Sequence, residues 1–214
     1  MYFRIKPAWF LPTTLLLSVL LAATGVRAQD HGQANAADQP LIRFSTDAGE
    51  PVIEYTMFHH MLANQDPEAL LRIYGNGRVH AHIPVYMNNA GDYEYRLSRP
   101  ELDALLLSLS QDGVIDFDPG AARQERKQLE DQQRAAGILH YISDSSDTII
   151  NIRLDEYQRH PSASRIKDLN TRFTWKNLQQ DAQQFPRSGA IKGAAASAQR
   201  LHDLLDHPGL QRIR

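Results

Sequence analysis

Two histidines that lie two positions apart, His80 and His82, are the residues whose types and spacing best suit metal chemistry. Alternate side chains of a β-strand project from the same face, so both imidazoles would point the same way. His59 or His60, on a nearby predicted strand, could supply a third nitrogen to a Zn²⁺ ion. Nothing in the sequence fixes that third ligand, and an exposed polar sheet face explains the pair without a metal. We therefore assign no metal or cofactor and keep His59, His80 and His82 as candidates.

The other reactive side chains are better explained by local structure. The acids in Asp116–Asp118 and Asp144–Asp147 lack the glycine and acid pattern of a twelve-residue calcium loop, and they suit a helix cap and a turn. The chain has no Cys, no G-x-S-x-G elbow and no S-x-x-K motif. Serines within 143–146 lie near His140, but a catalytic triad is defined by geometry and not by closeness in sequence. No catalytic residue is predicted.

A third group has the composition of a protein contact. Arg72, Tyr74 and Arg78 would share one sheet face with His80 and His82. Tyr and Arg are enriched among the residues that dominate binding energy in interfaces. These three residues are therefore the partner-binding candidates, and a solvated polar sheet face is the alternative.

The element that must position these side chains is a β-hairpin around Gly75-Asn76-Gly77. A two-residue turn would mix polar and apolar side chains on both faces, whereas a three-residue loop sorts them. The apolar face then pairs Ile73 with Val79 and Leu71 with Ala81, and the polar face pairs Tyr74 with Arg78 and Arg72 with His80. Gly77 is expected to hold a positive φ.

A leucine-rich helix follows the hairpin and a third strand, Asp92–Leu97. Ser98 is the expected N-cap, and Glu101 is its capping-box partner. The helix should end at Gly113. Its apolar stripe is expected to cover the sheet and consists of Leu102, Leu105, Leu106 and Leu109.

The remaining segments complete an α+β fold with a largely antiparallel sheet. Further strands are expected at 41–44, 52–60, 148–157 and 165–175. A polar helix at 118–136, packed only through Ala121, Ala122, Leu129 and Ala136, reads as a solvated insertion. Two C-terminal helices are expected at 178–185 and 190–206. Residues 41–214 form one domain, and residues 29–40 form a flexible leader.

The N-terminal segment predicts export. Arg4 and Lys6 precede an apolar region from Leu11 to Ala23, and small residues at Val26 and Ala28 favour cleavage before Gln29. The apolar run is short for a membrane span, so a signal peptide at 1–28 is favoured over an uncleaved anchor. The mature chain would then be periplasmic or secreted, with no stable membrane span.

The charge balance bears on possible partners. Residues 1–28 hold three of the 23 basic residues and none of the 25 acids, so cleavage leaves 20 basic against 25 acidic side chains. A general nucleic-acid binder should carry a basic excess, so none is expected here.

The pattern YGNGRV, Gly-Asp-Tyr and Leu-Ser-x-x-Glu-Leu in Leu70–Phe117 resembles a class of uncharacterised exported bacterial proteins. The order of strands, LSxxEL helix and strand pair is also similar to small emfourin-like protease inhibitors. The first resemblance implies no activity, and the second is architectural only, with the polar helix at 118–136 as an insertion relative to it. The leading hypothesis is thus a non-enzymatic interaction or inhibitory module for an unknown exported protein. The alternative is a metal-dependent or other hydrolase with a site assembled from dispersed His and carboxylate residues.

Overall fold

The computed structural model describes residues 39–60, 66–139 and 145–213. The strands are β1 (Leu41–Arg43), β2 (Pro51–His59), β3 (Leu71–Tyr74), β4 (Arg78–Ile83), β5 (Gly91–Arg96), β6 (Ser146–Gln158), β7 (Ile166–Lys176) and β8 (Gln211–Arg212). The helices are α1 (Arg99–Gln111), α2 (Pro119–Ala135), α3 (Leu178–Gln184), α4 (Gly189–Asp203) and the 3₁₀ turn η2 (Leu204–Asp206). The predicted α+β class is confirmed.

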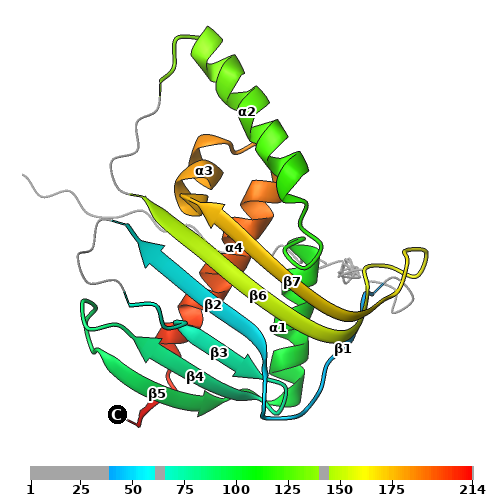
Figure 1. The fold of residues 1–214 in the computed structure, drawn as a ribbon, viewed down its shortest axis with the longest axis vertical. Coiled ribbons are helices and arrows are strands. Elements are labelled where there is room, and N and C mark those ends of the chain that lie inside the picture. Colours follow the sequence, from blue (N-terminus) through cyan, green and yellow to red (C-terminus); the bar gives the residue numbers. More distant parts are fainter. Residues whose placement is uncertain (1–38, 61–65, 140–144, 214) are drawn as a thin grey trace, which may run out of the picture. The chain divides into compact units, whose positions relative to one another are not determined.

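All eight strands join one sheet, and the recorded pairings are antiparallel. The long strand β6 organises it. β7 pairs along nearly the whole length of one edge of β6. The other edge is shared, because β2 pairs with the first part of β6 and β1 with its last residues. From β2 the order continues through β3, β4, β5 and β8 (Figure 1).

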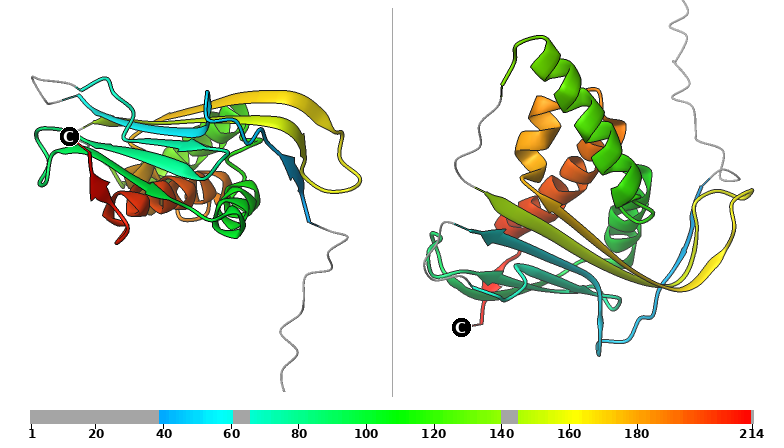
Figure 2. Two further views of the ribbon diagram at one scale, coloured as in Figure 1. Left: turned by 90° about the horizontal axis from the view of Figure 1, so that it is seen from below. Right: turned by 45° about the horizontal axis from the view of Figure 1, so that its top comes forward.

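The fold has two layers. Helices α1 and α4 lie on one side of the sheet, and no helix of the described residues covers the other side, which we call the open face (Figure 2). α2 runs past the end of β6 and β7, beside α3 (Figure 1). The core between the layers is apolar on both sides, as binary patterning requires. Its fully buried side chains include Ile53, Tyr55, Leu71, Ile73, Val79, Ala81, Ile150 and Ile152 from the sheet, and Leu102, Leu106, Leu109, Ile191, Ala194 and Leu201 from the helices.

The β3–β4 hairpin has the predicted register. Ile73 pairs with Val79, and Arg72 with His80. Gly77 has φ +85° and donates its N–H to the Tyr74 carbonyl at 2.9 Å, as the three-residue loop demands. Placing the apolar side chains of both strands on one face therefore predicted the three-residue loop correctly.

The capping box of α1 is also confirmed. Ser98 Oγ accepts from the Glu101 N–H, and Glu101 Oε2 accepts from the Ser98 N–H at 2.6 Å. Leu102, Leu106 and Leu109 are buried, but Leu105 is only partly buried at the edge of the stripe. The helix ends before Gly113, which has φ +78°.

Helix α2 departs from the expectation of a solvated insertion. Ala122 is buried, as predicted, but Ala121 and Ala136 are exposed. The helix is also held by polar contacts. Arg126 Nε donates to the buried Asp181 of α3 at 2.7 Å, and Glu125 accepts from Ser188 at 2.7 Å. These partners are far away in sequence, so the helix looked solvated from its composition alone.

The strand β8 was not predicted. It pairs with the outer edge of β5, where Glu94 faces Gln211, and the Ile213 N–H reaches the Asp92 carbonyl at 2.8 Å. Two residues are too few to show a period in the sequence. The predicted signal peptide, the predicted leader up to residue 38 and the predicted turn at Asp144 lie outside the described residues.

Candidate functional site on the open sheet face

The open face of β3, β4 and β5 carries the polar side chains predicted from the hairpin. Arg72, Tyr74, Arg78, His80 and His82 are all half-buried there, because the alternate positions point into the core. Charged neighbours hold most of these side chains. The polar side chains of this face therefore form a network of ion pairs.

Arg72 lies between two glutamates. Its Nη1 is 2.8 Å from Glu68 Oε1, and its Nε is 3.7 Å from Glu54 Oε1 on β2. The Arg72 side chain is 27% exposed, so part of the guanidinium remains accessible.

Tyr74 and Arg78 form the second unit, one on each side of the hairpin loop. The Arg78 guanidinium lies over the Tyr74 ring, 4.0 Å from its centroid, a cation–π geometry. Glu94 of β5 holds the same guanidinium, with 3.4 Å between Arg78 Nη1 and Glu94 Oε1. The predicted contact residues are thus on one face, and both arginines are oriented by acids.

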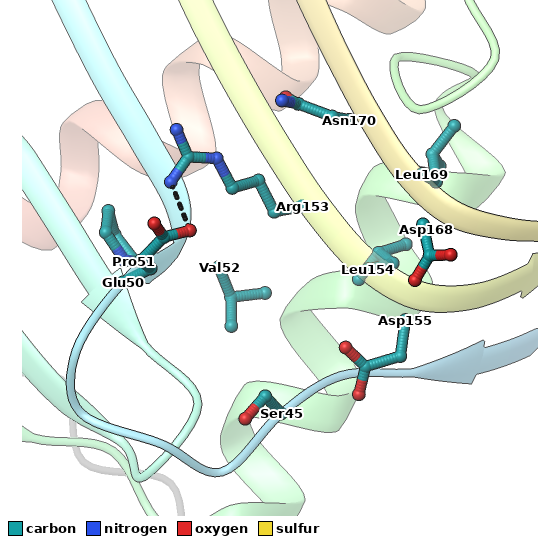
Figure 3. Close-up of a pocket in the computed structure, with 10 residues that line it drawn as sticks. All are labelled: Ser45, Glu50, Pro51, Val52, Arg153, Leu154, Asp155, Asp168, Leu169 and Asn170. Atoms are coloured by element: carbon teal, nitrogen blue, oxygen red, sulfur yellow. Dashed lines mark hydrogen bonds and ion pairs between the residues drawn. The ribbon is translucent and has the colours of Figure 1, made fainter.

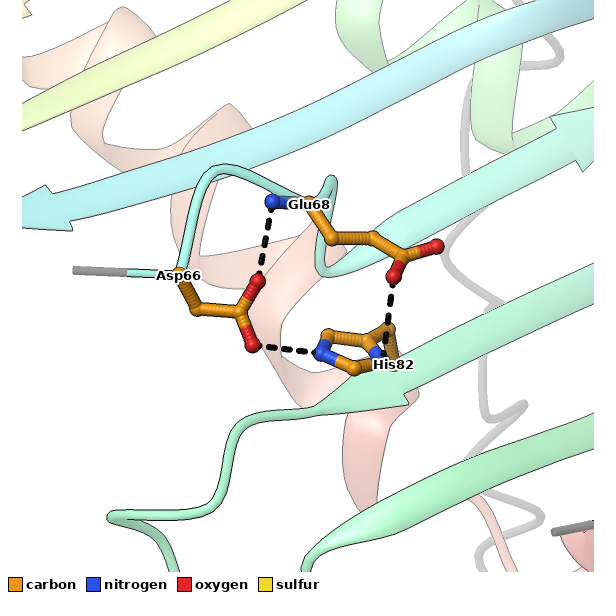
Figure 4. Close-up of side chains that lie close together, drawn as sticks. All are labelled: Asp66, Glu68 and His82. Atoms are coloured by element: carbon orange, nitrogen blue, oxygen red, sulfur yellow. Dashed lines mark hydrogen bonds and ion pairs between the residues drawn. The ribbon is translucent and has the colours of Figure 1, made fainter. Parts of the chain in front are cut away.

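The third unit surrounds His82 (Figure 4). His82 Nε2 is 2.8 Å from Asp66 Oδ2, and Nδ1 is 2.7 Å from Asp92 Oδ1. Glu68 Oε2 lies 3.7 Å from Nδ1. Asp66 and Glu68 come from the segment just before β3, and Asp92 comes from β5.

The carboxylates decide the protonation of His82. Partial burial alone favours the neutral ring, but the hydrogen bonds to Asp92 and Asp66 and the nearby Glu68 charge outweigh it, so the pKa of His82 is raised. The same contact lowers the pKa of Asp66, chiefly through the hydrogen bond from His82. The cluster is therefore an imidazole held between carboxylates that favour its protonated form.

The three histidines kept as metal candidates are not brought together. Among the described residues, the group whose ligand atoms lie within 4.8 Å of one another is Asp66, Glu68 and His82. His80 is 3.9 Å from Asp92 and is not in that group. His59 lies four residues after the buried Tyr55 on β2, so both side chains point to the same face. That face is the helix side of the sheet. The His59 ring instead meets Tyr86.

Sequence reasoning missed Asp66 and Glu68. The only local signal was their position in the loop that enters β3, two residues apart. Their closeness to His82 depends on the β3–β4 pairing and on how that loop crosses β4.

Two of the hollows in the described residues lie away from these side chains. The first, of about 250 Å³, lies beside the β1–β2 connection, where Arg153 pairs with Glu50 at 2.8 Å, and Asp155 and Asp168 also line it (Figure 3). The second, of about 510 Å³, lies between the end of α2 and the α3–α4 connection, beside Leu129 and Phe185.

The fold and this face define a two-layer α+β protein with an open, ion-paired sheet face. No protein-family model, curated protein or solved structure matches the chain. Within the described ranges, no helix is long and apolar enough to cross a membrane.

Proposed function

We propose that this chain is an exported, non-catalytic module that binds another exported protein through the open face of its sheet. Arg72, Tyr74 and Arg78 would make the contact. The observation that carries the proposal is the stack of Arg78 on Tyr74. It places the two residue types that most often dominate interfaces side by side on one sheet face.

The ion pairs of this face support binding by reducing its entropic cost. Ordering a long side chain at an interface costs roughly 0.5–1.5 kcal/mol. Arg78 is already fixed by Tyr74 and Glu94, and Arg72 by Glu68. A partner that presents carboxylates or carbonyl oxygens could use the free guanidinium N–H groups without ordering either side chain first.

The proposed location rests on the N-terminal segment. The charged start, apolar region and small residues of 1–28 favour export to the periplasm or the exterior. The acidic balance of residues 29–214 favours a protein partner over nucleic acid. Inhibition of the partner is the most specific form of this proposal, and its support is an architectural analogy, the similar order of strands, helix and strand pair in emfourin-like inhibitors.

The test is quantitative capture from the envelope fraction with the tagged mature protein. Tyr74→Ala combined with Arg78→Ala should weaken capture of the same partner by about thirtyfold, because losing such anchors commonly costs about 2 kcal/mol. The melting temperature should stay nearly unchanged, since both side chains lie outside the core. A purified partner, if it is an enzyme, is then assayed with and without one equivalent of the module.

Arg123→Ala is the matched control, because Arg123 is an exposed arginine on helix α2 and not on the sheet face. It should bind like the wild type. Equal capture by the double variant and the wild type would refute the proposed contact face. Loss of capture by both variants would show that the interaction depends on overall charge.

A further inference from the structure

We infer that Asp66, Glu68 and His82 form a binding site for a divalent first-row metal ion, with Zn²⁺ as the probe. One donor atom of each lies within 4.8 Å of the others. One imidazole nitrogen and two carboxylates form a mixed nitrogen and oxygen set that such ions accept. The inference does not depend on the proposed partner-binding role.

Each of the three side chains is already oriented by an outer partner. Asp66 Oδ1 accepts from the Glu68 N–H at 3.0 Å, which leaves Oδ2 facing His82. Glu68 Oε1 accepts from Arg72 at 2.8 Å, which leaves Oε2 on the side of the imidazole. His82 Nδ1 faces Asp92 at 2.7 Å, so Nε2 is the nitrogen available to a metal.

The contact between His82 Nδ1 and the Asp92 carboxylate is one that metal-binding histidines commonly make. A ligating imidazole almost always donates its other N–H to a carboxylate or a carbonyl, which fixes its tautomer and ring orientation. Asp92 holds that position, and it comes from β5, outside the ligand group. His82 Nε2 and Asp66 Oδ2 are therefore directed at each other, and Glu68 Oε2 lies beside the same ring, 3.7 Å from Nδ1.

Charge and access also favour a dication. Three carboxylates surround one imidazole, and the nearby Arg72 divides its charge between Glu68 and Glu54. The side chains of His82, Asp66 and Glu68 are 15%, 22% and 40% exposed, so an ion can enter from solvent. Glu68 is the most exposed ligand, and a change of its rotamer would bring Oε2 towards the Nε2 side. Three protein ligands leave a position for water or a partner group.

The test is zinc titration calorimetry on tag-free, chelator-treated full-length protein, together with the Co²⁺ absorption spectrum. The wild type should bind one equivalent of Zn²⁺, and the Co²⁺ bands should report nitrogen and oxygen ligands. His82→Gln should weaken binding by more than about a hundredfold, and Asp92→Asn by about 10–100-fold, as loss of an outer partner does. Asp66→Asn provides a second ligand variant if His82→Gln does not fold.

The matched control is His160→Ala, because His160 is an exposed histidine in the β6–β7 connection, bonded to Ser162. It should bind Zn²⁺ like the wild type. Wild-type protein that takes up less than one equivalent, or binds only at millimolar Zn²⁺, overturns the site. Unchanged affinity in folded His82→Gln or Asp66→Asn protein, or equal loss in His160→Ala, overturns it as well.

Discussion

Gly193 in α4 offers a sharp test of how α4 crosses α1. Helix propensity alone predicts that a Gly→Ala substitution inside a helix stabilises the folded protein by about 1 kcal/mol. The structure predicts the opposite, because a Cβ on Gly193 would fall on the carbonyl oxygen of Asp112, well inside the 3.0 Å that Cβ atoms keep from other atoms. That carbonyl cannot swing aside as a flexible side chain would.

The end of α1 is also held in place by α4. Asp112 Oδ2 accepts from Arg200 Nε at 3.2 Å and from Ser197 Oγ at 3.3 Å. Overpacking of this kind costs about 1–3 kcal/mol, so Gly193→Ala should be destabilising by roughly 0–2 kcal/mol once the helical gain of about 1 kcal/mol is subtracted. For a domain of this size, each kcal/mol lowers the melting temperature by about 2–4 °C.

The matched variant is Gly189→Ala at the start of the same helix. Nothing lies within 4 Å of its added Cβ, so this change should be neutral or stabilising by up to about 1 kcal/mol. Urea unfolding followed by circular dichroism measures both variants, with the slope expected to stay at the wild-type value. Gly193→Ala protein as stable as Gly189→Ala protein would refute the close crossing of α1 and α4.

Three further outcomes are expected. Gly77→Val should lower the free energy of unfolding more than Asn76→Ala, because φ +85° strains a β-branched residue; equal urea midpoints would argue for another loop. Hydrogen bonds from the Ser98 side chain and backbone lower the pKa of Glu101, so the stability it adds is present at neutral pH and is lost as the pH falls through that pKa. The stability difference between wild type and Glu101→Gln should therefore shrink from pH 7 to pH 3. Arg126→Ala removes the ion-pair partner of the buried Asp181, so it should lower the free energy of unfolding by at least about 1 kcal/mol in urea melts. Arg123→Ala on the same helix should leave the free energy of unfolding almost unchanged.

The parts of the fold that could be predicted are those whose cause is local. The hairpin register follows from a side-chain period of two and a glycine that permits positive φ. The start of α1 follows from Ser98 and Glu101, which satisfy backbone groups within four residues of each other. Long strands such as β6 show enough alternating positions for the period to be read.

The rest depends on partners that are distant in sequence. Arg126 looks like one more solvated charge until α3 brings Asp181 beneath it. The same holds for the candidate metal site, because Asp66 and His82 meet only after β3 and β4 have paired. His59 was a candidate because it lies on a nearby predicted strand, and its position on the helix side of β2 follows from which face of that strand is buried.

The shared edge of β6 has a consequence for the order in which the chain can fold. Residues 71–111 hold β3, β4, β5 and α1, which are neighbours in sequence, so they can assemble with little loss of loop entropy. β1 and the outer edge of β2 cannot be completed until residues 146–158 are present, since Arg43 pairs with Glu156 and His59 with Ser146. A nascent chain therefore exposes the apolar strand β2, with an unpaired edge, while the next hundred or so residues are made. Such edges recruit other chains, so we expect slow synthesis to favour aggregation over folding.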